Sequence, residues 1–497
     1  MRIPLEGTGP VDPARRRRVA AALLSVLPAD ALLVDEEDTR PYETDGLTLY
    51  RQLPMLVALP RDEREVAAVV RVCAGLGVPV VARGAGTGLS GGALPHSAGV
   101  VLSLARLDRI VSVDPTARTA RVQPGVRNLA ISEAAAALGL FYAPDPSSQV
   151  ACTIGGNVAE NSGGVHCLKY GLTLHNVLAV RGVTVEGEVV TIGSAAPDAP
   201  GLDLLSLVLG SEGMLLVLTE VCVKLLPRPA AVRCLMASFA SVEAAGEAVA
   251  ALIGAGLVPA ALEMMDQAAT RMVEPFVHAG YDLDAAAILL CESDGRAEDV
   301  AHEVAQIEQV LRGAGCTRIA TAADEAERLR FWAGRKNAFP AAGRVSPDYY
   351  CMDGTIPRRR LGAVLRAIGE MEIRHGLKCP NVFHAGDGNL HPLILFDAND
   401  PDSVARADAF GVDILKLCIE VGGTVTGEHG VGVEKINQLC DQFDAPTREA
   451  FLAVRRAFDP RGLLNPGKVI PTLHRRAEYG KQHVHAGRAP FPGLPRL

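Results

Sequence analysis

The 497-residue sequence predicts an α+β protein that is built from several α/β layers and ends in a helical C-terminal segment. Segments with strand-like and helix-like patterns alternate along most of the chain, and short connections join them. Hydrophobic residues make up 48% of the chain, which excludes disorder as its general state. At about 150 residues per domain, a chain of this length holds roughly three domains or fewer.

The N-terminal segment, residues 1–52, is expected to be helical. Four arginines at 15–18 precede a short apolar run, and this order imitates a secretory signal. Because Pro28 interrupts the apolar run and folded-looking sequence follows at once, we expect an amphipathic helix in a cytoplasmic protein instead. The sequence contains no run of 18 apolar residues, so it predicts no membrane-spanning helix.

A first α/β region is expected over residues 53–230. One of its helices begins at Asp62, and Glu65 completes a capping-box pattern three residues later. The other expected elements are strands at 53–60, 78–82, 100–104 and 119–126, a helix at 127–138, and strand pairs within 177–192 and 214–226.

A second α/β region is expected over residues 231–420, where strands and helices alternate again. Its expected elements are strands at 232–240, 258–265 and 287–293 and helices at 241–255 and 297–313. Residues 421–474 predict a helical C-terminal segment. Residues 475–497 mix Arg, His, Pro and Gly, which predicts a loosely packed tail.

Charge and cysteine usage exclude several function classes. The net charge of −8 argues against general nucleic-acid binding, which requires a basic surface. The eleven cysteines are scattered and form no C-x-x-C pair, so we expect inert thiols in a reducing compartment. Any iron–sulfur relay must therefore come from another polypeptide.

The first glycine-rich loop, RGAGTGLSGGALP, spans residues 83–95. Gly86 to Gly91 match the G-x-G-x-x-G pattern of dinucleotide-binding proteins, but an extended segment follows where the Rossmann fold requires a helix. The backbone N–H groups of such a loop form a concavity suited to a pyrophosphate. A flexible surface loop is the alternative. A second run of glycines and small polar residues, at 144–164, could hold another part of the same cofactor or be a cluster of turns.

The stretch from Asn381 to Pro392, NVFHAGDGNLHP, is expected to form a hairpin with Asp387-Gly388 as its two-residue turn. This turn would place His384 directly opposite His391, where two imidazoles could chelate one metal ion. Two ordinary histidines near a turn are the alternative.

Glu428 and His429, in the run TGEHGVG at 426–432, could supply a third metal ligand and a general base. Two imidazoles and one carboxylate suit Zn²⁺ or a neighbouring transition metal. Ordinary helix-cap residues are the alternative for this pair.

The two glycine-rich segments resemble the FAD-contacting segments of vanillyl-alcohol-oxidase-type (PCMH-type) flavoproteins, and GSEG at 210–213 resembles the third FAD motif of that fold. The resemblance implies an FAD-binding domain of two α/β subdomains over residues 53–230. Thr87 stands where some members attach the flavin covalently through a histidine, so non-covalent FAD is implied. The implied FAD contacts are Arg83, Gly84, Ala85, Gly86, Thr87, Gly88, Ser90, Pro144, Asp145, Ser148, Thr153, Gly156, Asn157, Asn161, Gly163, Gly164, Glu212, Gly213, Asn465 and Lys468.

The segments 383–391, 427–430 and 465–468 resemble the signature of D-2-hydroxyacid dehydrogenases that combine FAD with a divalent metal. Segments 331–340, 348–354 and 471–475 are similar to the FAD-bearing subunits of bacterial glycolate oxidases. The resemblance implies a ferredoxin-like substrate or cap domain over 231–420. It also implies the site residues His384, His391 and Glu428 as metal ligands, His429 as base and Arg335 as the substrate-carboxylate contact.

The implied reaction is the oxidation of a small 2-hydroxy acid, glycolate to glyoxylate. The implied partners are a second FAD-domain subunit and an iron–sulfur subunit, through which any contact with the inner face of a membrane would be made. Cys351 and Leu393 stand where relatives that act on hydroxyglutarate carry polar residues, which disfavours a dicarboxylic substrate. A D-lactate dehydrogenase and a non-catalytic FAD-binding scaffold are the alternatives, and a surface salt bridge is the alternative role of Arg335.

Overall fold

The computed structural model describes residues 3–4, 12–196 and 201–471. The chain forms two compact units. The seven-stranded unit comprises Gly163–Gly171 and Arg228–Glu428, and the two-sheet unit comprises the described residues of Arg2–Ser162, Leu172–Pro227 and His429–Leu497. The tail expected at 475–497 lies outside the described residues.

The seven-stranded unit is built on one sheet with the order β17-β14-β16-β15-β19-β20-β18. Its first four strands and the helices between them follow the order β14-α9-β15-α10-β16-α11-β17, which is the ferredoxin-like arrangement that the resemblance implied, with α10 as an additional helix. The remaining strands extend this sheet beyond β15. The strands are β14 (Ala231–Phe239), β15 (Ala261–Asp266), β16 (Ala287–Gly295), β17 (Arg318–Thr321), β18 (Asp348–Cys351), β19 (Asn381–His384) and β20 (Asn389–Phe396).

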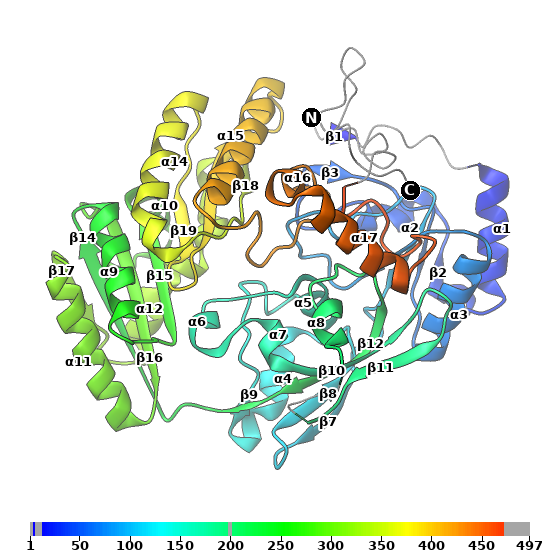
Figure 1. Ribbon diagram of the computed structural model, residues 1–497, viewed down its shortest axis with the longest axis horizontal. Helices are drawn as coiled ribbons and strands as arrows, with labels where there is room; N and C mark the ends of the chain where they lie inside the picture. The colour runs from blue at the N-terminus through cyan, green and yellow to red at the C-terminus, as the bar shows by residue number, and fades with distance from the viewer. Residues whose placement is uncertain (1–2, 5–11, 197–200, 472–497) are drawn as a thin grey trace. The chain divides into compact units, whose positions relative to one another are not determined.

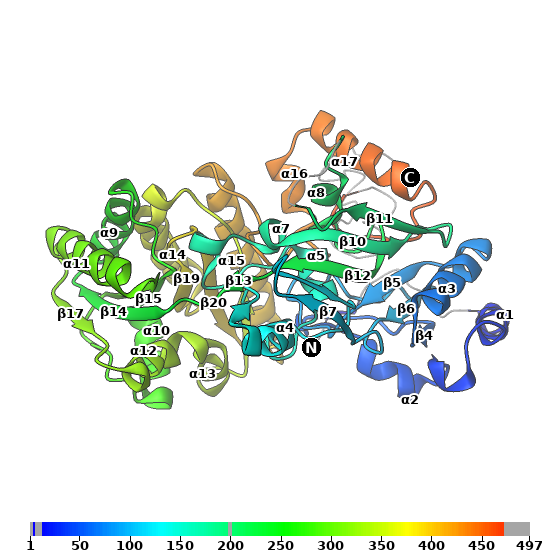
Figure 2. The same cartoon turned by 90° about the horizontal axis from the view of Figure 1, so that it is seen from below.

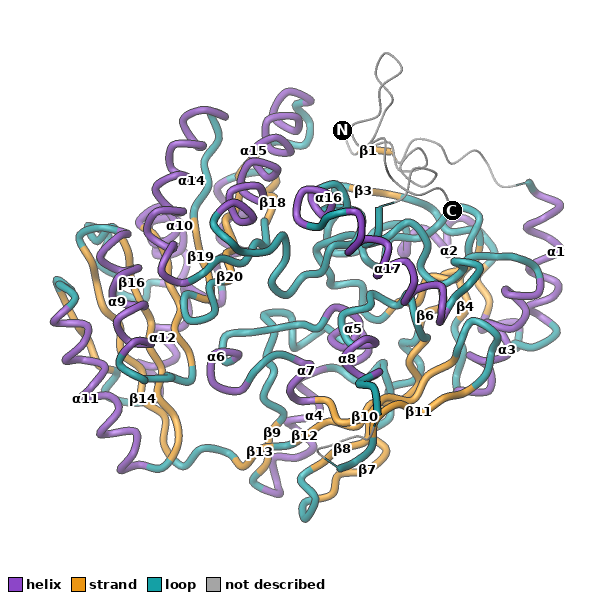
Figure 3. The backbone as a smooth tube through the Cα atoms, in the orientation of Figure 1, coloured by secondary structure: helices purple, strands orange, loops and turns teal. Residues whose placement is uncertain are grey.

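Helices cover both faces of this sheet, as Figure 2 shows, and Figure 3 separates these helices from the strands by colour. One face carries α9 (Val242–Gly254), α11 (Ala297–Gly313), α14 (Leu361–His375) and α15 (Pro401–Glu420). The other face carries α10 (Gln267–Val277), α12 (Glu325–Lys336) and α13 (Ala338–Val345). On that second face, apolar side chains of the strands, among them Met236, Met265 and Leu290, form a buried core with the three helices. The short helix α6 (Cys167–Tyr170) and the 3-10 turn η4 (Arg358–Arg360) complete the unit.

The β19–β20 hairpin differs from the expected one. Residues 385–388 connect the strands, so His384 pairs with Asn389 and His391 pairs with Val382. The expectation of a two-residue turn was wrong because the N–H groups of Asp387 and Gly388 both donate to the His384 carbonyl, at 3.1 and 3.0 Å, and close a wider turn. The register has moved by two residues, which keeps both histidines on one face as diagonal neighbours.

The two-sheet unit contains a four-stranded sheet, β2-β4-β6-β5, and a five-stranded sheet, β11-β10-β12-β8-β7. The first is parallel except for β2, and the second is antiparallel. These sheets are formed by β2 (Leu32–Leu33), β4 (Leu56–Ala58), β5 (Val80–Arg83), β6 (Val100–Ser103), β7 (Ile110–Asp114), β8 (Thr119–Val122), β10 (Val177–Val183), β11 (Val189–Gly193) and β12 (Val217–Lys224). Two further pairs join β1 (Ile3–Pro4) with β3 (Tyr50–Arg51) and β9 (Leu140–Phe141) with β13 (Leu226–Pro227).

Two helices of this unit, α3 and α1, form where the sequence signals placed them. The Asp62 carboxylate accepts a hydrogen bond from the Glu65 N–H at 2.9 Å, and the Glu65 carboxylate accepts one from the Arg61 N–H at 2.7 Å. The expected N-terminal helix is α1, whose Val19 and Leu23 are buried in the core. Figure 1 labels the helices α1 (Pro13–Leu24), α2 (Glu36–Thr39), α3 (Glu63–Gly75), α4 (Asn128–Ala135), α5 (Ile154–Glu160), α7 (Thr173–Asn176), α8 (Leu204–Val208), α16 (Gln438–Gln442) and α17 (Ala445–Phe458); η1 (Ala29–Ala31), η2 (Arg40–Tyr42) and η3 (Ala136–Leu138) are 3-10 turns.

The two glycine-rich stretches have different structures. Residues 84–98 contain no helix, which agrees with the exclusion of a Rossmann loop. The second stretch contains the helix α5, which the sequence did not predict; the Thr153 side chain caps it by accepting a hydrogen bond from the Gly156 N–H at 3.4 Å. Among the helices of the described ranges, none is long and apolar enough to cross a membrane. The described residues include all eleven cysteines, and every one of them is a free thiol.

Candidate active site

A cluster of two histidines and one carboxylate lies on the sheet of the seven-stranded unit. His384 at the end of β19 and His391 on β20 direct their Nε2 atoms to the Glu428 Oε1 atom, at 3.3 and 2.9 Å. One ligand atom from each residue lies within 4.8 Å of the others. The two rings meet edge to face, with their centroids 5.0 Å apart. The structure therefore brings together the three residues expected to hold a metal ion.

Glu263, on β15, holds two of the expected site residues. Its carboxylate accepts a hydrogen bond from the Arg335 Nε atom at 2.6 Å and contacts the His384 Nδ1 atom at 2.7 Å. The Glu263 and Arg335 side chains are 1% and 2% exposed. Because Nδ1 of His384 faces a carboxylate, its Nε2 atom is the nitrogen available to a metal. The sequence analysis missed Glu263; the signal was a single carboxylate within the apolar strand ALEMM at 261–265.

The charges of this cluster strongly favour a bound cation. Burial alone would lower the pKa of His384, but the carboxylates of Glu263 and Glu428 outweigh burial and raise it to about 10. Burial would raise the pKa of Glu428, but the two histidines hold it well below its usual range. A site with this balance favours a proton or a metal ion in the same place.

Asp353 fixes the segment that carries Glu428. Its buried carboxylate accepts hydrogen bonds from the backbone N–H groups of Gly427 and Glu428, at 3.1 and 3.2 Å, and from the Asn389 amide at 3.0 Å. Asn389 lies directly opposite His384 in the hairpin. One carboxylate thus joins the hairpin to the Glu428 segment. The three donor residues, together with the carboxylates of Glu263 and Asp353 that hold them, fit a divalent metal.

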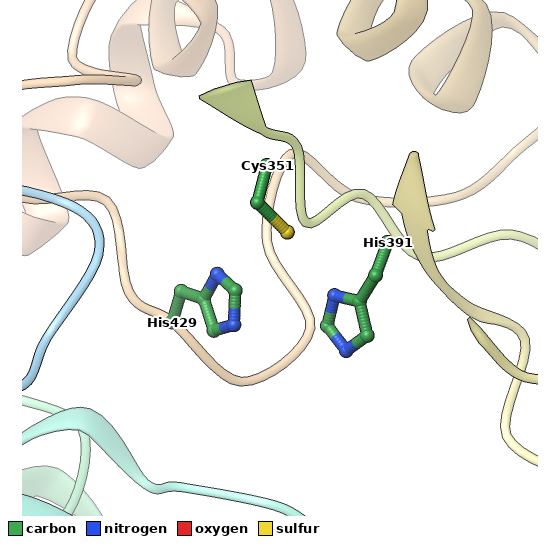
Figure 4. A group of neighbouring side chains, drawn as sticks. All are labelled: Cys351, His391 and His429. Carbon is green, nitrogen blue, oxygen red and sulfur yellow. The ribbon is translucent and has the colours of Figure 1, made fainter. Parts of the chain in front are cut away.

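Two uncharged side chains stand on the strands β18 and β20 near His391. Cys351, on β18, lies opposite Leu393, on β20, and both are buried. The Cys351 Sγ atom and a ring nitrogen of His391 lie within 4.8 Å. Figure 4 shows these two side chains pointing into the same space; it also labels His429, which follows Glu428 in the chain and begins the two-sheet unit.

The first glycine-rich loop is supported by Arg83. The Arg83 guanidinium is buried and donates to the Thr44 carbonyl at 2.8 Å. Gly86 has φ +71°, a left-handed conformation that favours glycine, and a Cβ atom there would lie 2.2 Å from the guanidinium and displace it. The Ser90 Oγ atom is buried and has no hydrogen-bond partner among the described residues. This orphaned hydroxyl and the open backbone of the loop fit the expected cofactor.

The second stretch meets the first loop at Gly84, where a Cβ atom would lie 2.3 Å from the Thr153 Oγ1 atom. The side chains of Asn157 and Asn161 form hydrogen bonds within the two-sheet unit. The Asn157 side-chain amide oxygen accepts from the Asn128 side-chain amide at 3.2 Å, and the Asn161 side-chain amide oxygen accepts from the Leu174 N–H at 2.9 Å. Gly84 and Thr153 thus bring the two expected cofactor segments into contact.

The third motif and the C-terminal motif form one buried network in the two-sheet unit. The Glu212 carboxylate accepts hydrogen bonds from the N–H groups of Val431 and Gly432, at 2.6 and 2.8 Å. The Asn465 amide donates to the carbonyls of Gly92 and Glu212, at 2.9 and 2.5 Å. The Lys468 ammonium donates to the Leu94 carbonyl and to the Asn465 side-chain amide oxygen, both at 2.8 Å. Glu212 therefore also anchors the loop that follows His429.

The expected site residues divide between the two units. The seven-stranded unit contains Arg335, His384, His391 and Glu428 together with Gly163 and Gly164. The two-sheet unit contains His429 and the other residues expected to contact FAD. The placement of Gly163 and Gly164 apart from the other cofactor residues was not foreseen from the sequence.

Comparisons with known proteins agree with this architecture. The description "FAD binding domain" matches residues 54–193, and "FAD linked oxidases, C-terminal domain" matches residues 228–469. The chain is 59% identical over 489 residues to the glycolate oxidase subunit GlcD of Escherichia coli (strain K12), covering 98% of each chain. It is 28% identical over 467 residues to a probable mitochondrial D-lactate dehydrogenase of Danio rerio, covering 93% of each chain.

Solved structures agree on the fold. The structure of p-cresol methylhydroxylase with substrate bound superposes with a TM-score of 0.79 at 18% identity, covering 93% of this chain and 98% of that one. This likeness shows a shared PCMH-type architecture, which agrees with the expected fold class. With both domain descriptions matched and such high identity to GlcD, the chain belongs to the family of FAD-linked oxidases.

Proposed function

We propose that this protein is an FAD-dependent 2-hydroxyacid dehydrogenase that oxidises glycolate to glyoxylate. The FAD-binding domain and the identity to GlcD support the cofactor and the class of reaction. The observation that carries the substrate class is the state of Arg335. Its side chain is buried beside the metal-ligand cluster, and its Nη2 atom has no hydrogen-bond partner among the described residues.

Arg335 binds the substrate carboxylate in this proposal. A buried guanidinium needs a partner for each of its N–H groups, and Glu263 occupies only Nε through a hydrogen bond. A carboxylate is the anion that best matches the remaining N–H groups of the guanidinium.

The proposed metal ligands are His384, His391 and Glu428. A divalent metal such as zinc, when bound there, would supply a Lewis acid for the 2-hydroxyl group. Glu263 holds His384 in the tautomer that exposes Nε2, and Asp353 fixes Glu428, so the chain positions the ligands in advance.

His429 is the proposed general base, which accepts the proton of the 2-hydroxyl group. Bound FAD would supply the acceptor for the hydride of the substrate Cα atom. Neutral histidine suits this task near pH 7, and the Val431 and Gly432 N–H groups tie the following residues to Glu212.

The pair Cys351 and Leu393 supports a small monocarboxylate. The two side chains offer no charge to a second carboxylate, and they stand opposite each other on neighbouring strands. Uncharged neighbours also tolerate a methyl group, so D-lactate is the second candidate, and the D-lactate dehydrogenase relative agrees with it.

The proposed setting is a multi-subunit complex. The relative GlcD is named a subunit of glycolate oxidase, and this chain has no C-x-x-C motif for an iron–sulfur relay. We infer that a second FAD-domain subunit and an iron–sulfur subunit accept the electrons, in the cytoplasm at the inner face of the membrane.

Flavin reduction tests the proposal. Purified protein is mixed anaerobically with glycolate, D-lactate or D-2-hydroxyglutarate, and the absorbance at about 450 nm is followed while the metal content is measured. Glycolate should bleach the flavin fastest, and His429→Asn should slow the bleaching by about 10²–10⁴-fold while FAD stays bound. Unchanged bleaching in His429→Asn would refute the base, and no bleaching by any of the three acids would refute the function.

A further inference from the structure

Glu292, on β16, is a second buried carboxylate that holds the helix carrying Arg335. Its Oε2 atom accepts hydrogen bonds from the Trp332 Nε1 atom and the Arg328 Nη1 atom, both at 2.7 Å. Its side chain is 4% exposed. Burial would raise the pKa of Glu292, but His166 and Arg328 hold it below its usual range, so the group is ionised.

Helix α12 is thus fixed to the sheet by two carboxylates. Arg328, Trp332 and Arg335 are spaced by four and three residues, which places them on one face of the helix. Glu263 pairs with Leu290 and Glu292 pairs with Ala261 across β15 and β16, so both carboxylates stand on the same face of the sheet. Glu263 contacts the metal-ligand cluster through His384, whereas Glu292 contacts a different part of the chain.

That other part is the segment Gly163–Gly171, which we call the strap. The chain enters it from Ser162 and leaves it at Leu172, both in the two-sheet unit, yet the strap belongs to the seven-stranded unit. The strap residue His166 contacts the Glu292 Oε1 atom through its Nε2 atom at 3.3 Å. The Lys169 ammonium and the Tyr170 hydroxyl donate to the Asp294 carboxylate, at 2.5 and 2.7 Å.

Trp332 and Arg335 lie one turn apart, and the turn between them is tightly held. The Tyr281 hydroxyl donates to the Phe331 carbonyl at 2.5 Å and accepts from the Gly334 N–H at 2.8 Å. A Cβ atom on Gly334 would lie 2.3 Å from the Tyr281 ring. A displacement of Trp332 would therefore be passed to Arg335 through a rigid turn.

We propose that Glu292 is a positioning residue that couples the strap to helix α12 and thereby sets the place of the Arg335 guanidinium. The inference rests on the proposed function, in which Arg335 binds the substrate carboxylate. The strap begins with Gly163 and Gly164, which are expected to contact FAD. The strap and helix α12 then share the buried carboxylate of Glu292. A displacement of either one therefore changes the position of the other.

Two variants of the full chain test this coupling: Glu292→Gln at the centre and His166→Gln on the strap. Two quantities are measured, the split between KM and kcat for glycolate and the deuterium uptake of peptides covering 163–171 and 325–336. Glu292→Gln should raise KM about tenfold with a much smaller change in kcat and should raise uptake in both segments. His166→Gln should raise uptake in 325–336 although its change lies on the strap.

Glu308→Gln is the matched control, because Glu308 also accepts a hydrogen bond, from the Thr321 hydroxyl at 3.1 Å, but has no contact with the strap or α12 among the described interactions. It should behave as the wild type. The inference is overturned if His166→Gln changes uptake only in the strap and leaves KM unaltered. If Glu292→Gln fails to fold, His166→Gln decides. Failure of glycolate to reduce the wild-type flavin would refute the proposed function, whereas the uptake of 325–336 still decides the coupling.

Discussion

Replacing Glu263 by glutamine tests whether this carboxylate organises both halves of the candidate site. The wild-type carboxylate faces Arg335 Nε at 2.6 Å through one oxygen and His384 Nδ1 at 2.7 Å through the other. A glutamine keeps one acceptor oxygen and gains an N–H₂ group. Because Arg335 has only donors, the amide oxygen must face it, and the N–H₂ group must face His384.

The forced orientation of the glutamine amide determines how much zinc affinity and stability the variant should lose. Facing an N–H₂ group, His384 Nδ1 must accept a hydrogen bond, so its neutral ring carries the proton on Nε2 and loses the lone pair that a metal needs. We expect zinc affinity to fall about 10–100-fold, as for other residues that orient a ligand histidine. The buried Arg335 charge also loses its carboxylate, which should destabilise the protein by about 3–5 kcal/mol.

Two assays measure these effects. Competition with a chromophoric chelator gives the zinc affinity, and urea unfolding followed by circular dichroism gives the stability. Glu308 is a partly exposed carboxylate in the same unit, with 34% of its side chain exposed. Its variant Glu308→Gln serves as the control and should stay within about 0.5 kcal/mol of the wild type. A Glu263→Gln protein with wild-type zinc affinity and wild-type stability would show that neither contact organises the site.

Three further predictions concern single residues. Arg335→Lys should raise KM for glycolate more than tenfold, because an ammonium cannot form the two parallel hydrogen bonds of a guanidinium; an unchanged KM in steady-state assays would contradict this. Gly86→Ala should release FAD, because the added Cβ atom meets the Arg83 guanidinium and φ is +71° at this position. The ratio of flavin to protein absorbance after gel filtration measures the release, and full retention of FAD would contradict the proposed role of this loop in FAD binding. Burial raises the pKa of Asp45 to about 7. The fold therefore favours the protonated carboxyl, and the wild type should lose up to about 4 kcal/mol of stability as pH rises from about 4 to 7. Asp45→Asn should remove this loss in thermal unfolding; parallel pH profiles of the two proteins would oppose the reasoning.

The local patterns predicted much of the fold. The alternation of strands and helices over 231–313 anticipated a separate α/β layer, and the capping box at Asp62 marked the start of α3 within one residue. These features are predictable because they depend on hydrophobic period and on hydrogen bonds between near neighbours. The hairpin register was missed because a dipeptide such as Asp387-Gly388 does not determine how many residues the turn contains.

The candidate site was predicted less completely, for a physical reason. His384, His391 and Glu428 were recognisable as ligand types, but the residues that hold them act across distant strands. Glu263 accepts a hydrogen bond from Arg335, which lies 72 residues away in sequence, and no local sequence pattern predicts such a pair. The placement of Gly163 and Gly164 likewise depends on ion pairs between the strap and β16, which only the folded chain brings together.

The indole that donates to Glu292 has a practical consequence. Trp332 is the only tryptophan in the chain, so all indole fluorescence of the protein originates one helical turn from Arg335. The emission is thus an intrinsic optical probe of helix α12. A carboxylic acid that lacks the 2-hydroxyl group could be titrated into the oxidised enzyme and its binding followed at this one chromophore, without any turnover of the flavin.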